Sequence, residues 1–394
     1  MEKFPEKSKA GLRGKYPLLV LAGLAFALIL LEVISRLFLE NPQTFQAQKL
    51  NQNSDNFLQK IGLEELDFYY ETKTGLRFIP NIKGTIKNHY ISKKDVQVST
   101  NSLGFRSKEL PQKTQNDFRI LVLGDSITAG DYLDEEKTYP ALLESFLKTE
   151  KPEDLKQKNI EVINAGIAST GAGSQIALLT EKGLTLKPDL ILVGMYLNDA
   201  QDSLNLKAIK VPPLLQKIKL INMVFEKLNL IIKNEKFSKT AEPVFDKAGR
   251  AFIENNQISS SSEQWSKDPK AFNSLIFQNF KDWGFSFTDE FWEKEENQFK
   301  ILKTISENNK AKLMFVLFPV RYQVESEILN NFPQQKFEEK MSQLNITHLD
   351  LLSSLREKFA SNKESFYYDQ AHPTEEGMKF IASELSAFVK TSLK

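Results

Sequence analysis

The chain contains no cysteine, and only three histidines occur among its 394 residues. Without cysteine it has no disulfides and no thiolate metal ligands, and cysteine usage gives no information on the redox compartment. The three histidines are widely separated, and none belongs to a His-x-x-x-His pair. A dedicated zinc or iron site is therefore not expected.

The chain also lacks an excess of charge of either sign. It has 52 basic and 51 acidic residues, so no overall field would recruit nucleic acid. Its length exceeds that of one ordinary core, which favours one large domain with appendages or two domains. An apolar content of 41% is enough for a buried core.

A long uncharged apolar run lies near the N-terminus, at residues 16–31. Extended through residues 33–39, a helix of this sequence would cross a hydrocarbon core about 30 Å thick. Five basic residues precede the run, against two acidic ones. By the positive-inside rule, we expect residues 1–40 to form a cytoplasmic tail and a single-pass transmembrane anchor, with the catalytic part periplasmic or extracellular.

Two other interpretations of this run remain open. The segment Ala25-Phe26-Ala27 has the small-x-small pattern of a signal-peptide cleavage site, which would give a soluble exported protein. Four more aliphatic residues follow it, so an uncleaved anchor is favoured. A buried core helix is the third interpretation.

The remaining chain is predicted to have two parts. Residues 41–116 are interpreted as an Asn/Gln-rich stalk followed by a small strand-rich lobe, with short alternating runs at 76–79 and 96–99. From residue 117 to residue 394, apolar strands alternate with amphipathic helices. Continuous apolar strands are typical of a parallel, doubly wound α/β sheet that is covered on both faces.

The elements of this larger part are predicted as follows. Strands are predicted at residues 120–123, 162–163, 190–193, 313–318 and 346–351. Helices are predicted at residues 138–149, 174–185, 289–308, 324–342 and 374–391. The alternation stops at about residues 200–288, an insertion with an amphipathic stretch at 214–234 and an aromatic-rich end. It forms either a lid over the ligand-binding edge of the sheet or a helical elaboration packed outside it.

Four strand-end segments carry groups suited to acyl transfer. Ser126 follows the first strand, Gly166 follows the second, Asn198 follows the third, and Asp369 and His372 follow the fifth. The carboxyl ends of parallel strands meet in one crevice, so these segments are expected to come together. They supply a nucleophile, a base, an orienting carboxylate and hydrogen-bond donors for an oxyanion.

These blocks resemble those of the SGNH, or GDSL, hydrolase family. The resembling blocks are Gly124-Asp125-Ser126, Asn164-Ala165-Gly166, Asn198-Asp199 and Asp369-x-x-His372. The resemblance implies a flavodoxin-like three-layer α/β/α sandwich, with Ser126 as nucleophile, His372 as base and Asp369 orienting it. It further implies an oxyanion hole made by Ser126, Gly166 and Asn198. The chain departs from the family at Tyr196, where a glycine is common.

Other residues are weaker candidates. Arg106, Arg321 and Gln323 are possible substrate-binding residues, although a structural arginine and a loop are the alternatives that we favour for them. His348 with Asp350 is a rival dyad, more simply interpreted as a strand histidine and its neighbour. His89 is predicted at the surface, and Asp125 and Asp199 as structural hydrogen-bonding residues.

The sequence thus predicts a membrane-anchored serine esterase or O-acyltransferase that uses neither metal nor organic cofactor. Its expected substrate is an acyl ester of the cell envelope, an O-acetylated glycan or a lipid, and nucleic acid is not an expected partner. The alternatives are a membrane-tethered lipase or lysophospholipase, and a non-enzymatic envelope scaffold that retains the fold.

Overall fold

The computed structural model describes residues 68–72, 74–198, 263–279 and 282–393. The expected anchor, the stalk and the predicted helix at 214–234 lie outside these residues. Within the described ranges, no helix combines the length and apolar character needed to cross a membrane.

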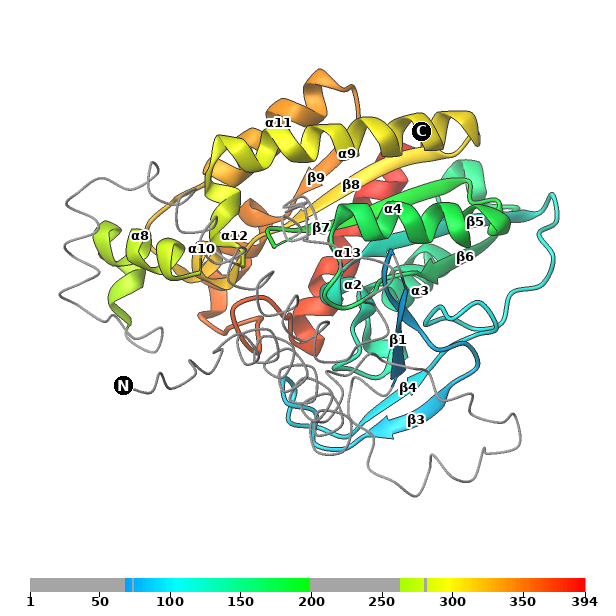
Figure 1. Ribbon diagram of the computed structural model, residues 1–394, viewed down its shortest axis with the longest axis horizontal. Coiled ribbons are helices and arrows are strands. Elements are labelled where there is room, and N and C mark those ends of the chain that lie inside the picture. Colours follow the sequence, from blue (N-terminus) through cyan, green and yellow to red (C-terminus); the bar gives the residue numbers. More distant parts are fainter. Residues whose placement is uncertain (1–67, 73, 199–262, 280–281, 394) are drawn as a thin grey trace, which may run out of the picture. The chain divides into compact units, whose positions relative to one another are not determined.

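A five-stranded parallel sheet forms the centre of the fold (Figure 1). The strand order is β6-β5-β7-β8-β9, so the first strand of the sheet in the chain lies second in space. The prediction of a doubly wound parallel sheet is confirmed, with all five strands close to the predicted positions. The strands are β5 (Asp117–Gly124), β6 (Asn159–Asn164), β7 (Leu190–Tyr196), β8 (Lys312–Phe318) and β9 (Thr347–Asp350).

Helices cover both faces of this sheet, as the three-layer prediction requires (Figure 1). On one side α3 (Tyr139–Thr149) packs against α13 (Glu375–Ser392). On the other side α9 (Asp289–Asn308) contacts both α4 (Ala172–Glu181) and α11 (Phe332–Gln343). Because both faces are covered, β7 is buried along its whole length.

Two helix starts follow directly from local sequence. Thr288 caps α9 by accepting the N–H of Phe291, and Thr374 caps α13 by accepting the N–H of Gly377. Both threonines precede acidic first turns, a combination that favours the start of a helix.

The prediction of one helix over residues 324–342 is wrong. The segment instead contains α10 (Arg321–Glu325), an extended residue Ser326, and the separate helix α11. Proline is tolerated in the first turn of a helix but not in its interior. Pro333 therefore sits at the start of α11 rather than in the middle of a longer helix.

Before the sheet, the described residues from 68 onward form four short strands in two antiparallel pairs. They are β1 (Tyr69–Thr72) with β2 (Gly75–Phe78), and β3 (Lys83–Ile86) with β4 (Val96–Ser99). This lobe contacts the larger domain through polar groups: the Tyr69 hydroxyl donates to Asp131 in a buried contact, and the buried Arg77 pairs with the partly exposed Glu181 at 3.0 Å. The lobe therefore packs against the segment that follows the predicted nucleophile.

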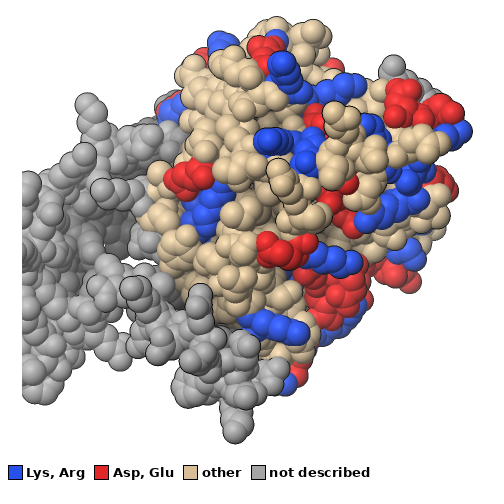
Figure 2. Space-filling view, turned by 90° about the vertical axis from the view of Figure 1, so that its right-hand side faces the viewer, with Lys and Arg blue, Asp and Glu red and all other residues tan. Residues whose placement is uncertain are grey.

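Strand β6 lies at one edge of the sheet, and side chains cap its outward backbone donors. The N–H of Val162 donates to Glu144 at 2.7 Å, and that of Asn164 donates to the Ser107 hydroxyl at 2.8 Å. Unpaired donors on an edge strand invite pairing with another chain, and these caps remove two of them. On the face shown in Figure 2, basic and acidic side chains are interspersed.

Candidate active site

The predicted nucleophile stands at the first residue of a short helix, α2 (Ser126–Ala129), directly after β5. Asp125 caps this helix by accepting the N–H of Ile127 at 2.9 Å. The first N–H groups of a helix have no partner inside the helix. The N–H of Ser126 is therefore available to a negatively charged oxygen beside its own side chain.

The loop before α13 holds the histidine in a fixed orientation. One oxygen of Asp369 accepts the backbone N–H groups of Ala371 and His372, both at 2.8 Å. The backbone of Tyr368 donates to the carbonyl of His372 at 2.8 Å, which closes the loop behind the ring. The histidine ring is thus positioned by both backbone and side-chain contacts.

Ser126, His372 and Asp369 form a continuous line of hydrogen bonds. The Ser126 Oγ lies 2.9 Å from His372 Nε2, and His372 Nδ1 lies 2.8 Å from Asp369 Oδ2. An ionised carboxylate can only accept, so Nδ1 carries the proton and Nε2 is free to accept from the serine. This is the arrangement that general-base activation of a serine requires.

The charges around this line also favour a basic histidine. Burial lowers the pKa of His372, but its hydrogen bond to Asp369 and the charge of that carboxylate more than compensate, so the net pKa is raised. Burial raises the pKa of Asp125 to about 6, because its carboxyl is enclosed beside the nucleophile.

Gly166 lies where only a glycine fits. A Cβ at this position would be 2.3 Å from the N of Ala129 and 2.6 Å from the carbonyl carbon of Thr128. The absent side chain brings the loop after β6 against α2, and the N–H of Gly166 donates to the Asn164 side chain at 3.0 Å. The predicted oxyanion-hole glycine thus contacts the helix that carries Ser126.

The end of β7 contributes Asn198 and a tyrosine that departs from the family pattern. Tyr196 is fully buried, and its hydroxyl lies 3.5 Å from the carbonyl of Gln370. It ties β7 to the loop that carries Asp369 and His372. The Asn198 side chain is hydrogen-bonded to Asp282, a residue just before η7 (Gly284–Phe287). Asp199 lies outside the described residues.

The weaker candidates occupy different environments. Arg106 is 1% exposed, and its guanidinium donates to the carbonyls of Ala129 and Leu133 at 2.7 and 3.0 Å. Gln323 is also 1% exposed, and its amide bonds to Asn330 and Gln334. Both side chains are thus buried and hydrogen-bonded to protein groups. Arg321 is half-buried and pairs with Glu325 at 2.8 Å.

The other two histidines have different surroundings. His348 bonds through Nε2 to Glu338 at 2.6 Å and through Nδ1 to the carbonyl of Ile346. The prediction that His89 lies at the surface is wrong: it is 1% exposed and stacks on Tyr90 with ring centroids 4.9 Å apart. His89 is buried because its ring lies between the lobe and Tyr132 of the larger domain.

Two residues near the site were not predicted from the sequence. Tyr132 is fully buried with its ring 5.0 Å from that of His372, edge to face. Asp282, near the C-terminal end of the insertion, is hydrogen-bonded to Asn198, and it acts electrostatically on His372. Neither belongs to a short motif, so only the tertiary fold identifies them.

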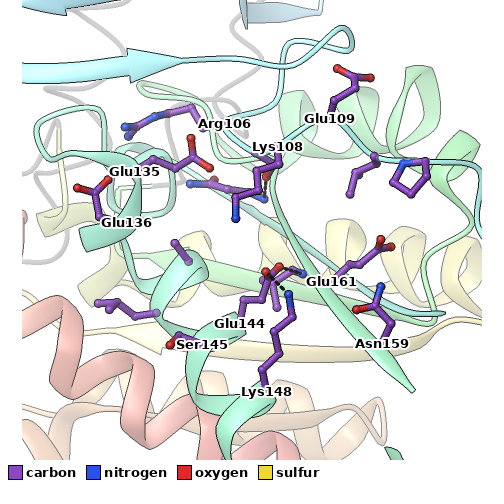
Figure 3. Close-up of a pocket in the computed structure, with 17 residues that line it drawn as sticks. Arg106, Lys108, Glu109, Glu135, Glu136, Glu144, Ser145, Lys148, Asn159 and Glu161 are labelled. Atoms are coloured by element: carbon purple, nitrogen blue, oxygen red, sulfur yellow. Dashed lines mark hydrogen bonds and ion pairs between the residues drawn. The ribbon is translucent and has the colours of Figure 1, made fainter. Parts of the chain in front are cut away.

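A separate polar cavity of about 700 Å³ runs along the outer edge of β6 (Figure 3). Its walls are α3 on one side and the chain from Arg106 to Pro111 on the other. Many of the charged groups in it are paired with neighbours, as in Glu144 with Lys148 at 2.6 Å. Ser126 and His372 are not among its lining residues.

Comparisons with known proteins agree with the geometry. A family model described as GDSL-like lipase/acylhydrolase matches residues 120–385. An arylesterase from Vibrio mimicus is 34% identical over 90 residues, which are 23% of this chain and 42% of that relative. The match thus spans less than half of the arylesterase.

Similar solved structures include two carbohydrate esterases. One is a two-domain esterase active on acetylated mannans, 14% identical, with 70% of this chain and 49% of that chain covered at a TM-score of 0.40. The other is a catalytic mutant of an acetylxylan esterase from Geobacillus stearothermophilus, 13% identical, with 70% and 96% covered at a TM-score of 0.39.

The family match covers two thirds of the chain and includes every block that carries the serine, glycine, asparagine and histidine. The chain therefore belongs to the GDSL-like lipase/acylhydrolase family, the SGNH hydrolases.

Proposed function

We propose that Ser126 attacks the ester carbonyl and carries the acyl group as a covalent intermediate. His372 Nε2 takes the proton of the Ser126 hydroxyl as the new C–O bond forms. His372 then returns this proton to the departing alcohol oxygen, which leaves acyl-Ser126. In the second half, water or another hydroxyl gives its proton to His372 and attacks the acyl carbon. His372 then returns this proton to Ser126 Oγ as the acyl–oxygen bond breaks, which restores the free serine.

The observation that carries this proposal is the unbroken line from Ser126 Oγ to His372 and Asp369, at 2.9 and 2.8 Å. The tetrahedral intermediate bears a negative oxygen beside the start of α2. The N–H of Ser126 and the amide of Asn198 are proposed to stabilise it, which lowers the barrier of the step in which charge develops. The N–H of Gly166 is proposed to join them by turning from the Asn164 side chain, to which it donates at 3.0 Å, toward the oxyanion.

The proposed substrate is an O-acylated glycan of the cell envelope, and an O-acetyl group fits best. Support comes from the apolar run at residues 16–31 with basic residues before it, which we propose anchors the chain with the catalytic domain outside the cytoplasm. Whether the acceptor is water or a second hydroxyl determines whether the enzyme is an esterase or an O-acyltransferase.

One observation weakens the alternative of a lipase. The aromatic-rich end of the insertion suggested a lipid-binding surface, but Trp283, Phe285 and Phe272 are each at most 1% exposed. Trp283 packs on Tyr322 with ring centroids 5.8 Å apart. In the described part of the insertion these aromatic side chains build a core instead of an exposed apolar surface.

The mechanism is tested with the full-length protein in detergent. Ser126→Ala and His372→Ala should each remove nearly all esterase activity, and the double variant should lose little more, because the two residues act as a unit. An organophosphonate should label the wild type and fail to label Ser126→Ala. Near wild-type rates for Ser126→Ala would overturn the mechanism.

The substrate class is tested with esters of graded acyl length, including acetylated glycan fragments. We expect the highest kcat/KM with acetyl esters. A steady rise with acyl length would favour the lipase alternative, and absence of both turnover and labelling would favour the scaffold.

The location is tested by protease treatment of intact spheroplasts. The catalytic domain should be degraded while residues 1–15 are protected, and the chain should stay in the membrane after carbonate washing. A mature protein that begins near residue 28 would mean a cleaved signal, and protection of the whole domain would place it in the cytoplasm.

A further inference from the structure

We propose that Asp282 is a positioning residue that fixes the amide of Asn198 in the oxyanion hole. The two residues are far apart in the sequence, yet their side chains are hydrogen-bonded. This inference rests on the proposed function, since it assigns Asp282 to the same reaction. Asp282 lies within the insertion, near its C-terminal end, and would thus belong to the catalytic site.

The turn that carries Asp282 is rigid. The N–H groups of Asp282 and Gly284 both donate to the carbonyl of Asn279 at 2.9 Å. A Cβ on Gly284 would lie 2.1 Å from the carbonyl oxygen of Ile276, so the turn closes tightly on α8 (Pro269–Gln278). The backbone of Asp282 is therefore held in place, which limits the positions that its side chain can take beside Asn198.

A buried aromatic cluster fixes this turn to the sheet domain. Trp283, next to Asp282, is fully buried and packs against Phe287 and Tyr322. Trp265 packs against the same Tyr322, with centroids 4.9 Å apart. Because α10 carries Tyr322 and directly follows β8, the cluster places Asp282 at the same sheet edge as the Asp369–His372 loop.

The contact also decides which way the Asn198 amide points. An ionised carboxylate can only accept, so it selects the NH2 group of Asn198 rather than its oxygen. One of the two N–H bonds then points to Asp282, and the other remains for the oxyanion. Without an acceptor at this position, the amide can rotate and present its oxygen, which would repel the developing negative charge.

The site contains a countercharge for this carboxylate. Asp282 is half-buried and interacts electrostatically with His372. When Ser126 attacks, His372 becomes an imidazolium, so a nearby carboxylate faces a positive charge as well as the oxyanion. The attraction of Asp282 to the imidazolium offsets its repulsion of the oxyanion. We therefore assign to Asp282 the role of orienting the Asn198 amide, and no role for its negative charge.

A double-mutant cycle on the full-length protein tests this assignment. Asp282→Ala should lower kcat about 10-fold or more with KM little changed, which is less than the ~10²–10³ loss expected for removing an oxyanion donor. In an Asn198→Ala background the same change should cost less than about 3-fold, because the amide that Asp282 positions is gone. Asp282→Asn, which keeps an acceptor oxygen, should retain most of the activity.

Glu290→Gln is the matched control, since it neutralises an exposed carboxylate of α9 that pairs with Lys294. It should leave kcat unchanged. If Asp282→Ala does not fold, Asp282→Ser takes its place in the cycle. Melting temperature and phosphonate labelling of Ser126 verify the fold of every variant.

Two results would overturn the inference: equal losses from Asp282→Ala with and without Asn198, or a rise in KM at constant kcat. Either result leaves the proposed function intact provided that Ser126→Ala is inactive. Activity in Ser126→Ala would instead reject the proposed function itself.

Discussion

The ring of Tyr132 meets that of His372 edge to face, with centroids 5.0 Å apart and planes inclined by 72°. Tyr132 is completely buried, and its other neighbours include His89 of the lobe and Tyr368 of the histidine loop. The side chain of Tyr132 therefore lies between the lobe and His372, and it contacts both. Packing on one side and Asp369 on the other hold the imidazole in place.

Tyr132→Phe should keep full activity and raise the free energy of unfolding by about 1 kcal/mol. Within the described residues the Tyr132 hydroxyl is buried without a hydrogen-bond partner, and such a group costs stability. Tyr132→Ala should cost about 3–5 kcal/mol, as expected for an emptied aromatic site, and should lower kcat. Chemical denaturation and esterase assays measure both, and a large loss of activity in Tyr132→Phe would show that the hydroxyl participates.

The acid limb of kcat/KM should lie above pH 6.5. The base must be neutral to accept a proton, and the net pKa of His372 is raised because Asp369 outweighs the effect of burial. Asp369→Asn removes the raising partner, so the limb should move to lower pH while the plateau falls. The profile is measured between pH 4 and pH 9 with a small chromogenic ester. A limb that moves upward in Asp369→Asn would contradict this assignment.

Asp125→Asn should stabilise the protein at neutral pH. Burial raises the pKa of Asp125 from its ordinary 3.8 to about 6, so between these pH values the folded state holds a proton that the unfolded state has released. The resulting loss of stability is absent below about pH 4, grows between pH 4 and pH 6, and levels off above pH 6 at about 1–3 kcal/mol. Asparagine keeps the cap on Ile127 and removes the penalty.

Melting temperatures between pH 3.5 and pH 8 measure this effect, which should be greatest at high pH. Asp117→Asn is the control, because hydrogen bonds from Thr114 lower the pKa of that exposed carboxyl to about 2. Asp117 stabilises the fold above its ordinary pKa, so its replacement should not raise the melting temperature at pH 8. An equal gain from both variants would indicate a general charge effect.

Gly166→Ala should reduce kcat and lower the melting temperature together. The new Cβ would overlap the backbone of Thr128 and Ala129, which cannot move without displacing α2. Gly183→Ala is a useful comparison, since its Cβ meets mainly the mobile end of the Leu121 side chain. Gly183→Ala should affect stability more than kcat. If Gly166→Ala and Gly183→Ala lose the same fraction of kcat, the assignment of Gly166 to the oxyanion hole is wrong.

Arg106→Met should destabilise the protein without changing KM. It would leave the carbonyls of Ala129 and Leu133 without their donor, at a cost of about 1–3 kcal/mol each when buried. Denaturation and steady-state kinetics separate this from substrate binding. A raised KM with unchanged stability would restore Arg106 as a substrate-binding residue.

The sequence predicted the sheet and the order of the catalytic blocks because both are local. Continuous apolar runs mark buried strands, and Ser126, Asn198 and His372 each follow a strand or precede a capped helix. Arg106 and His89 could not be placed in this way, since their burial depends on how the lobe packs against the residues after α2. Asp282 was missed because its proposed role arises from a contact between the end of the insertion and Asn198, 84 positions earlier, which no local spacing records.

Ser126 and His372 are separated by 246 positions in the chain, yet their side chains touch. Contacts of such long range form late in folding, since a large part of the chain must be ordered before they are made. During synthesis the proposed nucleophile emerges long before the proposed base. On the proposed mechanism the chain therefore gains activity only after the loop before α13 has placed His372 beside Ser126.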